Sequence, residues 1–136
     1  MKTVMVFGTF DIFHKGHENF LKQAKKYGDY LIVVVARDET VKETKKQDTR
    51  NRETKRVRIL RNSKIAEKVV LGSLGDKYAV IKKYKPDVIC LGYDQKFFVE
   101  KLKSKLKEFG LKCTKIKRLE PYKPSVYKSS KLGKRR

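Results

Sequence analysis

Residues 4–17 read VMVFGTFDIFHKGH: an apolar run, a glycine-bearing loop and two histidines three positions apart. The run from Val4 to Phe7 predicts a buried strand, and the segment Gly8–His17 predicts a turn that leads into a helix. In an open parallel sheet, ligands bind outside the carboxyl ends of the strands. This loop therefore lies where a ligand is expected.

The same alternation of short apolar runs and helical patterns continues along the chain, which is typical of a parallel sheet with crossover helices. The predicted strands are Val4 to Phe7, Tyr30 to Ala36, Lys68 to Leu71, Val88 to Leu91 and Leu111 to Ile116. The second run is continuously apolar, as expected for a central strand covered on both faces. We predict an α/β fold: a single Rossmann-like doubly wound domain with a five-stranded parallel sheet.

Helical spacing of apolar residues predicts four helices between these strands. They are marked by Phe20, Leu21, Ala24 and Tyr27, by Val57, Ile59 and Leu60, by Tyr78 to Tyr84, and by Phe98, Leu102, Leu106 and Phe109. Gly28 and Gly110 stand where the first and last helices should be capped. We assign residues 1–132 to the domain and residues 133–136 to a basic C-terminal tail.

Charge and cysteine content restrict the class of protein. The chain has 36 Lys and Arg against 15 Asp and Glu, a formal net charge of +21. Such an excess indicates either an anionic partner or adaptation to high temperature. Cys90 and Cys113 have no metal-ligand spacing and are expected to be reduced core residues. Without a signal segment or an apolar stretch of about 20 residues, we expect a cytoplasmic protein with no membrane association.

The loop after the first strand has the residue types that phosphate chemistry needs. Gly8 and Gly16 permit close approach of the backbone to phosphate, and a helix beginning near His17 directs N–H groups at an anion. His14 and His17 are the only histidines in the chain. Three residues apart at a helix start, they can donate hydrogen bonds to a phosphate as charge develops on it. No residue is placed as a covalent nucleophile, because Thr9 lacks a base and an orienting acid.

Residues 8–17 resemble the H-x-G-H signature of the cytidylyltransferase-like nucleotidyltransferase superfamily. Residues 36–41, ARDETV, and 91–95, LGYDQ, resemble strand-end motifs of the archaeal FAD synthetases within it. Residues 127–132, YKSSKL, are similar to the I-S-T-T-K-I-type motif of the superfamily. The resemblance extends from Val4 to Leu132 and implies a nucleotidyltransferase.

The resemblance also implies roles for individual residues. The implied catalytic residues are His14, His17, Lys45 and Arg56, with Arg56 on the triphosphate. The implied nucleotide and acceptor contacts are Gly8, Thr9, Phe10, Asp11, Asp38, Gly92, Tyr93, Asp94, Ser129 and Ser130.

Several of these roles have alternatives. Lys42 and Lys46 compete with Lys45 for the role of the mobile lysine, and Arg118, Lys123 and Lys128 compete for the basic residue near the serines. Asp38 fits the acceptor or a magnesium shell, and Asp94 fits the nucleoside, while either is also a possible helix cap. Flavin would need an aromatic wall, for which Phe10, Phe13 and the Tyr122 or Tyr127 region are candidates, although Phe10 fits core packing equally well.

The resemblance implies transfer of AMP from ATP to FMN, giving FAD and pyrophosphate by direct in-line attack. The expected cofactor is Mg²⁺ or another divalent cation bound mainly through the triphosphate, with no metal-ligand cluster assigned to the protein. We expect a homodimer, and nucleic acid contact only through non-specific basic surface. One alternative is a CTP:glycerol-3-phosphate cytidylyltransferase, and another is a basic RNA-binding module on a degenerate nucleotidyltransferase fold.

Overall fold

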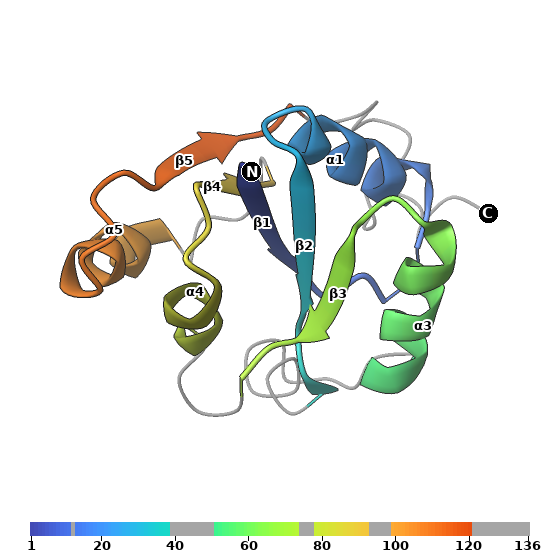
Figure 1. The fold of residues 1–136 in the computed structure, drawn as a ribbon. Coiled ribbons are helices and arrows are strands. Elements are labelled where there is room, and N and C mark those ends of the chain that lie inside the picture. Colours follow the sequence, from blue (N-terminus) through green and yellow to red (C-terminus); the bar gives the residue numbers. More distant parts are fainter. Residues whose placement is uncertain (12, 39–50, 74–77, 93–98, 121–136) are drawn as a thin grey trace.

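Five parallel strands form one sheet in the computed structural model, which describes residues 1–11, 13–38, 51–73, 78–92 and 99–120 (Figure 1). The strands are β1 (Thr3–Gly8), β2 (Tyr30–Val35), β3 (Lys68–Leu71), β4 (Val88–Leu91) and β5 (Lys115–Arg118). The helices are α1 (Lys15–Lys25), α3 (Glu53–Ser63), α4 (Ala79–Tyr84) and α5 (Val99–Glu108). The sheet order is β3-β2-β1-β4-β5, which confirms the predicted doubly wound α/β fold.

The helices cover both faces of this sheet, α1 and α3 on one side and α4 and α5 on the other (Figure 1). Successive residues of a strand point to opposite faces. In β2, Leu31 and Val33 therefore join the core with α1 and α3, while Ile32 and Val34 join the core with α4 and α5. Two buried faces explain why the predicted central strand is continuously apolar.

β1 lies in the middle of the sheet, and the chain leaves it and its neighbour β4 in opposite directions. β1 connects through α1 to β2 on one side, whereas β4 connects through α5 to β5 on the other. The carboxyl ends of β1 and β4 therefore form the topological switch point, where open α/β sheets bind ligands. Gly8 is the last residue of β1, Gly92 follows β4, and the loop after β1 leads to His14 and the start of α1, which contains His17.

The fifth strand begins later than the sequence predicted, at Lys115 instead of Leu111. Gly110 adopts the left-handed conformation with φ 74°, as its predicted capping position requires. The Leu111 N–H then donates to the Leu106 carbonyl, so that the chain closes the helix end before it turns into β5. Cys113 consequently lies exposed in this turn, and its predicted core position was wrong. Cys90 is buried as predicted, and burial raises the pKa of its thiol to about 12.

The end of α1 also differs from the prediction. The helix ends at Lys25, and Tyr27 is 39% exposed instead of covering the sheet. Gly28 does not adopt a left-handed capping conformation. Its role is close approach to β1, because a Cβ there would lie 2.7 Å from the Lys2 carbonyl oxygen.

Candidate active site

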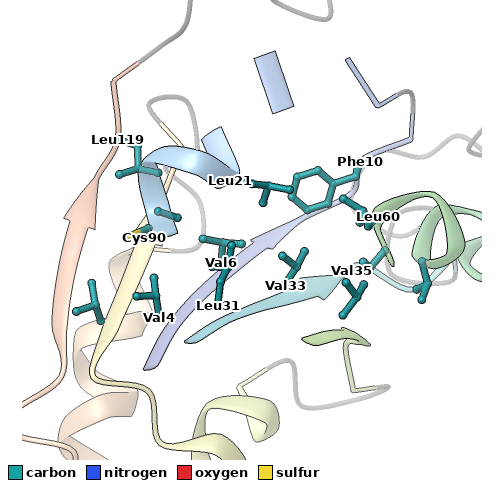
Figure 2. Close-up of a cluster of buried hydrophobic side chains, with 14 residues drawn as sticks. Val4, Val6, Phe10, Leu21, Leu31, Val33, Val35, Leu60, Cys90 and Leu119 are labelled. Carbon is teal, nitrogen blue, oxygen red and sulfur yellow. The ribbon is translucent and has the colours of Figure 1, made fainter. Parts of the chain in front are cut away.

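The loop between β1 and α1 is anchored by Phe10, whose ring points into the core (Figure 2). Phe10 is only 5% exposed and packs in the same cluster as Leu21 and Leu60. Of the two roles left open for this side chain, the structure shows core packing. Its backbone has a φ of 52°, a left-handed conformation that bulky residues rarely adopt.

Gly8 makes room for this ring. A Cβ at Gly8 would lie 2.6 Å from the Phe10 Cε2 atom, closer than carbon atoms pack. The absence of a side chain at Gly8 therefore lets the loop fold back over β1 with its aromatic ring inserted. This contact, within the protein, is distinct from the approach to phosphate expected from the sequence.

His14 is the N-cap of α1. Its backbone is extended, with φ −139° and ψ −179°, and its Nδ1 atom accepts a hydrogen bond of 3.0 Å from the Gly16 N–H. The Glu18 N–H donates to the His14 carbonyl at 3.0 Å. An N-cap satisfies backbone donors that the first helical turn leaves without partners. The helix thus begins at Lys15, two residues before the predicted start near His17.

This cap fixes the chemistry of the His14 imidazole. A nitrogen that accepts a hydrogen bond carries no proton, so the neutral ring has its proton on Nε2. Burial lowers the pKa of His14 from its ordinary value of 6.5, which favours this neutral form at pH 7. His14 therefore presents one N–H donor in a defined direction.

His17 stacks on His14, with ring centroids 3.9 Å apart and planes inclined by 21°. The His17 ring also makes an edge contact with Phe10 at 5.2 Å and stacks with Phe13 at 6.0 Å. Aromatic contacts of this kind restrict how the ring can turn. The structure thus brings together the two predicted catalytic histidines, and it uses Phe13 to hold one of them.

Arg56 lies in the first part of α3 and has no exposed surface. Its Nε donates to the Asn51 carbonyl at 3.1 Å, and one terminal nitrogen donates to the Thr9 carbonyl at 2.8 Å. The other terminal nitrogen forms an ion pair of 2.7 Å with Asp38 Oδ1. The direct triphosphate contact implied by the resemblance would need an exposed guanidinium, whereas that of Arg56 is buried.

Asp38 also caps α3. Its Oδ2 accepts from the Glu53 N–H at 3.1 Å, while Glu53 Oε1 accepts from the Asp38 N–H at 2.8 Å. Glu53 further pairs with Arg37, whose Nε donates to the Gly72 carbonyl at 2.7 Å. This reciprocal pair agrees with the capping alternative considered for Asp38.

Asn51 holds the loop after β1 from the other side. Its N–H donates to Asp11 Oδ1 at 2.8 Å, and its side-chain amide donates to the Asp11 carbonyl at 2.6 Å. Neither Asn51 nor Glu53 was predicted as a site residue. Their place at the start of a predicted helix, where Asn and Glu commonly make capping bonds, was the only available signal.

At the end of β4, Arg118 Nη1 donates to the Gly92 carbonyl at 2.7 Å. Of the three candidates for the basic residue near the serines, Arg118 is therefore placed beside the switch point. The predicted residues that lie outside the described part of the chain are Lys42, Lys45, Lys46, Tyr93, Asp94, Tyr122, Lys123, Tyr127, Lys128, Ser129 and Ser130.

Within the described residues, no group of three or more His, Cys, Asp or Glu side chains could hold a metal ion. Both oxygens of Asp38 accept bonds from protein donors, as does Asp11 Oδ1. This donor set fits a cation that binds through phosphate oxygens better than one held in a protein cage. No helix in the same part of the chain is long and apolar enough to cross a membrane.

The sheet is doubly wound and parallel, and a capped helix and two stacked imidazoles lie at its switch point. This arrangement is typical of a protein that binds phosphate-bearing nucleotides. The chain belongs to the cytidylyltransferase-like family, whose model matches residues 5–135.

Relatives with a described activity cover nearly the whole chain. It is 47% identical to the FAD synthase of Pyrococcus abyssi over 97% of this chain and 90% of the relative. The FAD synthase of Thermoplasma volcanium is 40% identical over 99% and 94%, respectively.

Solved structures agree with the fold. One from Thermoplasma volcanium, described as a lipopolysaccharide core biosynthesis protein, superposes with a TM-score of 0.83 at 41% identity and covers 90% of this chain and 98% of its own. A pantoate–beta-alanine ligase from Francisella tularensis has a TM-score of 0.64 at 19% identity over 91% of this chain and 61% of its own, and shows the fold alone.

Proposed function

We propose that this protein is an FMN adenylyltransferase, which transfers AMP from ATP to FMN and releases pyrophosphate. The observation that carries the proposal is the stacked pair His14 and His17 at the switch point of a chain 40–47% identical to archaeal FAD synthases. The match covers at least 97% of this chain and at least 90% of each relative, so the comparison applies to the whole of both proteins.

The reaction is a direct displacement at phosphorus. A phosphate oxygen of FMN attacks the α-phosphorus of ATP and forms the new P–O bond. The bond between the α-phosphorus and the bridging oxygen breaks in line, and that oxygen leaves with pyrophosphate. Negative charge shifts toward the oxygens of the leaving group during this step.

His14 and His17 stabilise that charge as hydrogen-bond donors. The Nε2–H of neutral His14 is directed by the cap at Nδ1, and His17 is held by three ring contacts. Donors that are already oriented cost no reorganisation when the charge develops, so they act more strongly in the transition state than in the ground state. The N–H groups of the first turn of α1 contribute positive potential in the same region.

Other parts of the site have proposed roles that follow the resemblance. Lys45, or its neighbours Lys42 and Lys46, contacts the triphosphate. Gly92, Tyr93 and Asp94 border the nucleoside, Ser129 and Ser130 bind the β- and γ-phosphates, and Thr9 and Asp11 line the loop. The proximity of Arg118 to Gly92 supports a binding region at the end of β4.

We propose Mg²⁺ or another divalent cation bound mainly through the triphosphate, where it would neutralise phosphate charge. A cytoplasmic location and a homodimer are also proposals, and gel filtration with light scattering tests the second. CTP with glycerol 3-phosphate and a pure RNA-binding role are less favoured, because the relatives are FAD synthases.

A product assay tests the function. The protein is incubated with ATP, FMN and MgCl₂, and flavins and pyrophosphate are separated by chromatography. FAD and pyrophosphate should appear in equal amounts, and a folded His17→Ala variant should form both about 10²–10³-fold more slowly. Pyrophosphate without FAD, or equal rates in the variant, would contradict the proposal.

A further inference from the structure

Arg56 is a charged side chain in the protein core, and such a group is stable only when its hydrogen-bond partners are in place. All three guanidinium nitrogens meet acceptors within 3.1 Å. The guanidinium is planar and donates in fixed directions, so its three acceptors must keep a defined arrangement.

These acceptors come from three separate segments. Thr9 lies in the loop after β1, Asp38 follows β2, and Asn51 precedes α3. Asn51 in turn holds Asp11 through two hydrogen bonds of 2.8 and 2.6 Å. The backbone from Thr9 to Asp11 is therefore fixed at one end by Arg56 and at the other by Asn51, three residues before His14.

The carboxylates around Arg56 also compensate for its position. A positive charge in the first turn of a helix is disfavoured by the helix dipole, whereas carboxylates there are favoured. Asp38 accepts from the Glu53 N–H at the start of α3, and Glu53 accepts from the Asp38 N–H. Asp38 and Glu53 thus stabilise the site where Arg56 is buried.

We propose that Arg56 is a positioning residue: together with Asp38 and Glu53 it sets the path of the loop from Thr9 to Asp11, and thereby the orientation of His14 and His17. This role differs from the triphosphate contact implied by the resemblance. Its kinetic consequence rests on the proposed AMP transfer, whereas its structural consequence does not.

The first measurement needs no substrate. Imidazole ¹H–¹⁵N spectra of labelled wild-type protein are compared with those of Arg56→Lys and Asp38→Asn, which change little volume. Both variants should shift the signals of His14 and His17 in the same direction. Arg58→Lys is the matched control, because Arg58 lies two residues further along α3 with an exposed side chain. It should leave the signals unchanged.

The second measurement is kinetic. Misplacing the histidines should lower kcat for FAD formation roughly 10- to 100-fold in Arg56→Lys and in Asp38→Asn. Because the two residues act as one unit, the double variant should be no slower than the worse single variant. If Arg56 bound triphosphate directly, Arg56→Lys would instead raise KM for ATP and weaken inhibition by pyrophosphate. The factors by which Arg56→Lys and Asp38→Asn reduce activity would then multiply in the double variant.

Glu53→Gln serves if Arg56→Lys does not fold, since it keeps Arg56 and weakens the contacts of Glu53 with Asp38 and Arg37. Smaller shifts of the same histidine signals are expected. Unchanged imidazole signals in a folded Arg56→Lys or Glu53→Gln variant would overturn the proposal. If wild-type protein makes no FAD but the signals shift as stated, the proposed function fails and the positioning role stands.

Discussion

The imidazoles of His14 and His17 stack with their centroids 3.9 Å apart, and the same His14 ring caps α1 through its Nδ1 atom. His14 therefore has a structural role through Nδ1, and the proposed reaction gives it a chemical role through Nε2. A substitution that removes only one of these roles can distinguish the two.

Asparagine at position 14 should keep the cap and remove the donor. Its carboxamide oxygen is among the preferred N-cap acceptors, whereas alanine has none. His14→Asn and His14→Ala should both lower kcat about 10²–10³-fold. Only His14→Ala should also lose about 0.5–2 kcal/mol of unfolding free energy, measured by urea titration. Near wild-type activity in a folded His14→Asn protein would contradict the donor role.

The acid side of the stability curve should depend on His14. Burial lowers the pKa of His14 in the folded protein below its ordinary value of 6.5. Between that lowered pKa and pH 6.5, the unfolded chain therefore binds a proton that the folded chain does not. The stabilisation is present above pH 6.5 and is lost as the pH falls through the lowered pKa. His14→Asn should remove this part of the slope in urea titrations over that range. If the unfolding free energies of wild type and His14→Asn had the same slope against pH in this range, His14 would not titrate as stated.

Gly8→Ala should destabilise the loop through a clash with Phe10. The added Cβ would lie 2.6 Å from the ring, and overpacking of this kind typically costs about 1–3 kcal/mol. Gly72→Ala is a matched control, because its Cβ would meet its nearest neighbours at 3.6 Å, an ordinary contact. Adding Phe10→Leu should make the Gly8→Ala substitution less costly in a double-mutant cycle. Equal melting temperatures for the two alanine variants would contradict this account.

Lys45→Met should raise KM for ATP and lower kcat, since a cation on the triphosphate contributes to binding and to transition-state stabilisation. Lys42→Met and Lys46→Met identify which of the three lysines dominates. Lys101→Met controls for net charge, because Lys101 is exposed on α5. Unchanged steady-state kinetics in a triple Lys42, Lys45 and Lys46 variant would contradict a role for these lysines in triphosphate binding.

Local patterns predicted the sheet well, because each strand and helix has its own periodicity. The prediction was wrong near Leu111, because the apolar residues that follow α5 were assigned to the strand, whereas β5 (Lys115–Arg118) is rich in Lys and Arg. The hydrogen bond from the Leu111 N–H to the Leu106 carbonyl places Leu111 at the end of the helix. Gly28 was misread for a related reason: its constraint comes from the Lys2 backbone, 26 positions away.

The candidate site was partly predictable. His14 and His17 lie within one motif, so the sequence alone brings them together. Arg56 lies four residues before Leu60 and thus on the buried face of α3, a signal that was available but easily overlooked for a charged residue. Its partners Asp38 and Thr9 are 18 and 47 positions away, and only the fold brings them into contact.

The central claim is AMP transfer from ATP to FMN, and kcat/KM tests it most directly. The four combinations of ATP or CTP with FMN or glycerol 3-phosphate are measured with the same protein preparation and divalent cation, using pyrophosphate release and chromatography of the product. We predict the highest kcat/KM for ATP with FMN. A higher value for CTP with glycerol 3-phosphate would contradict the assignment.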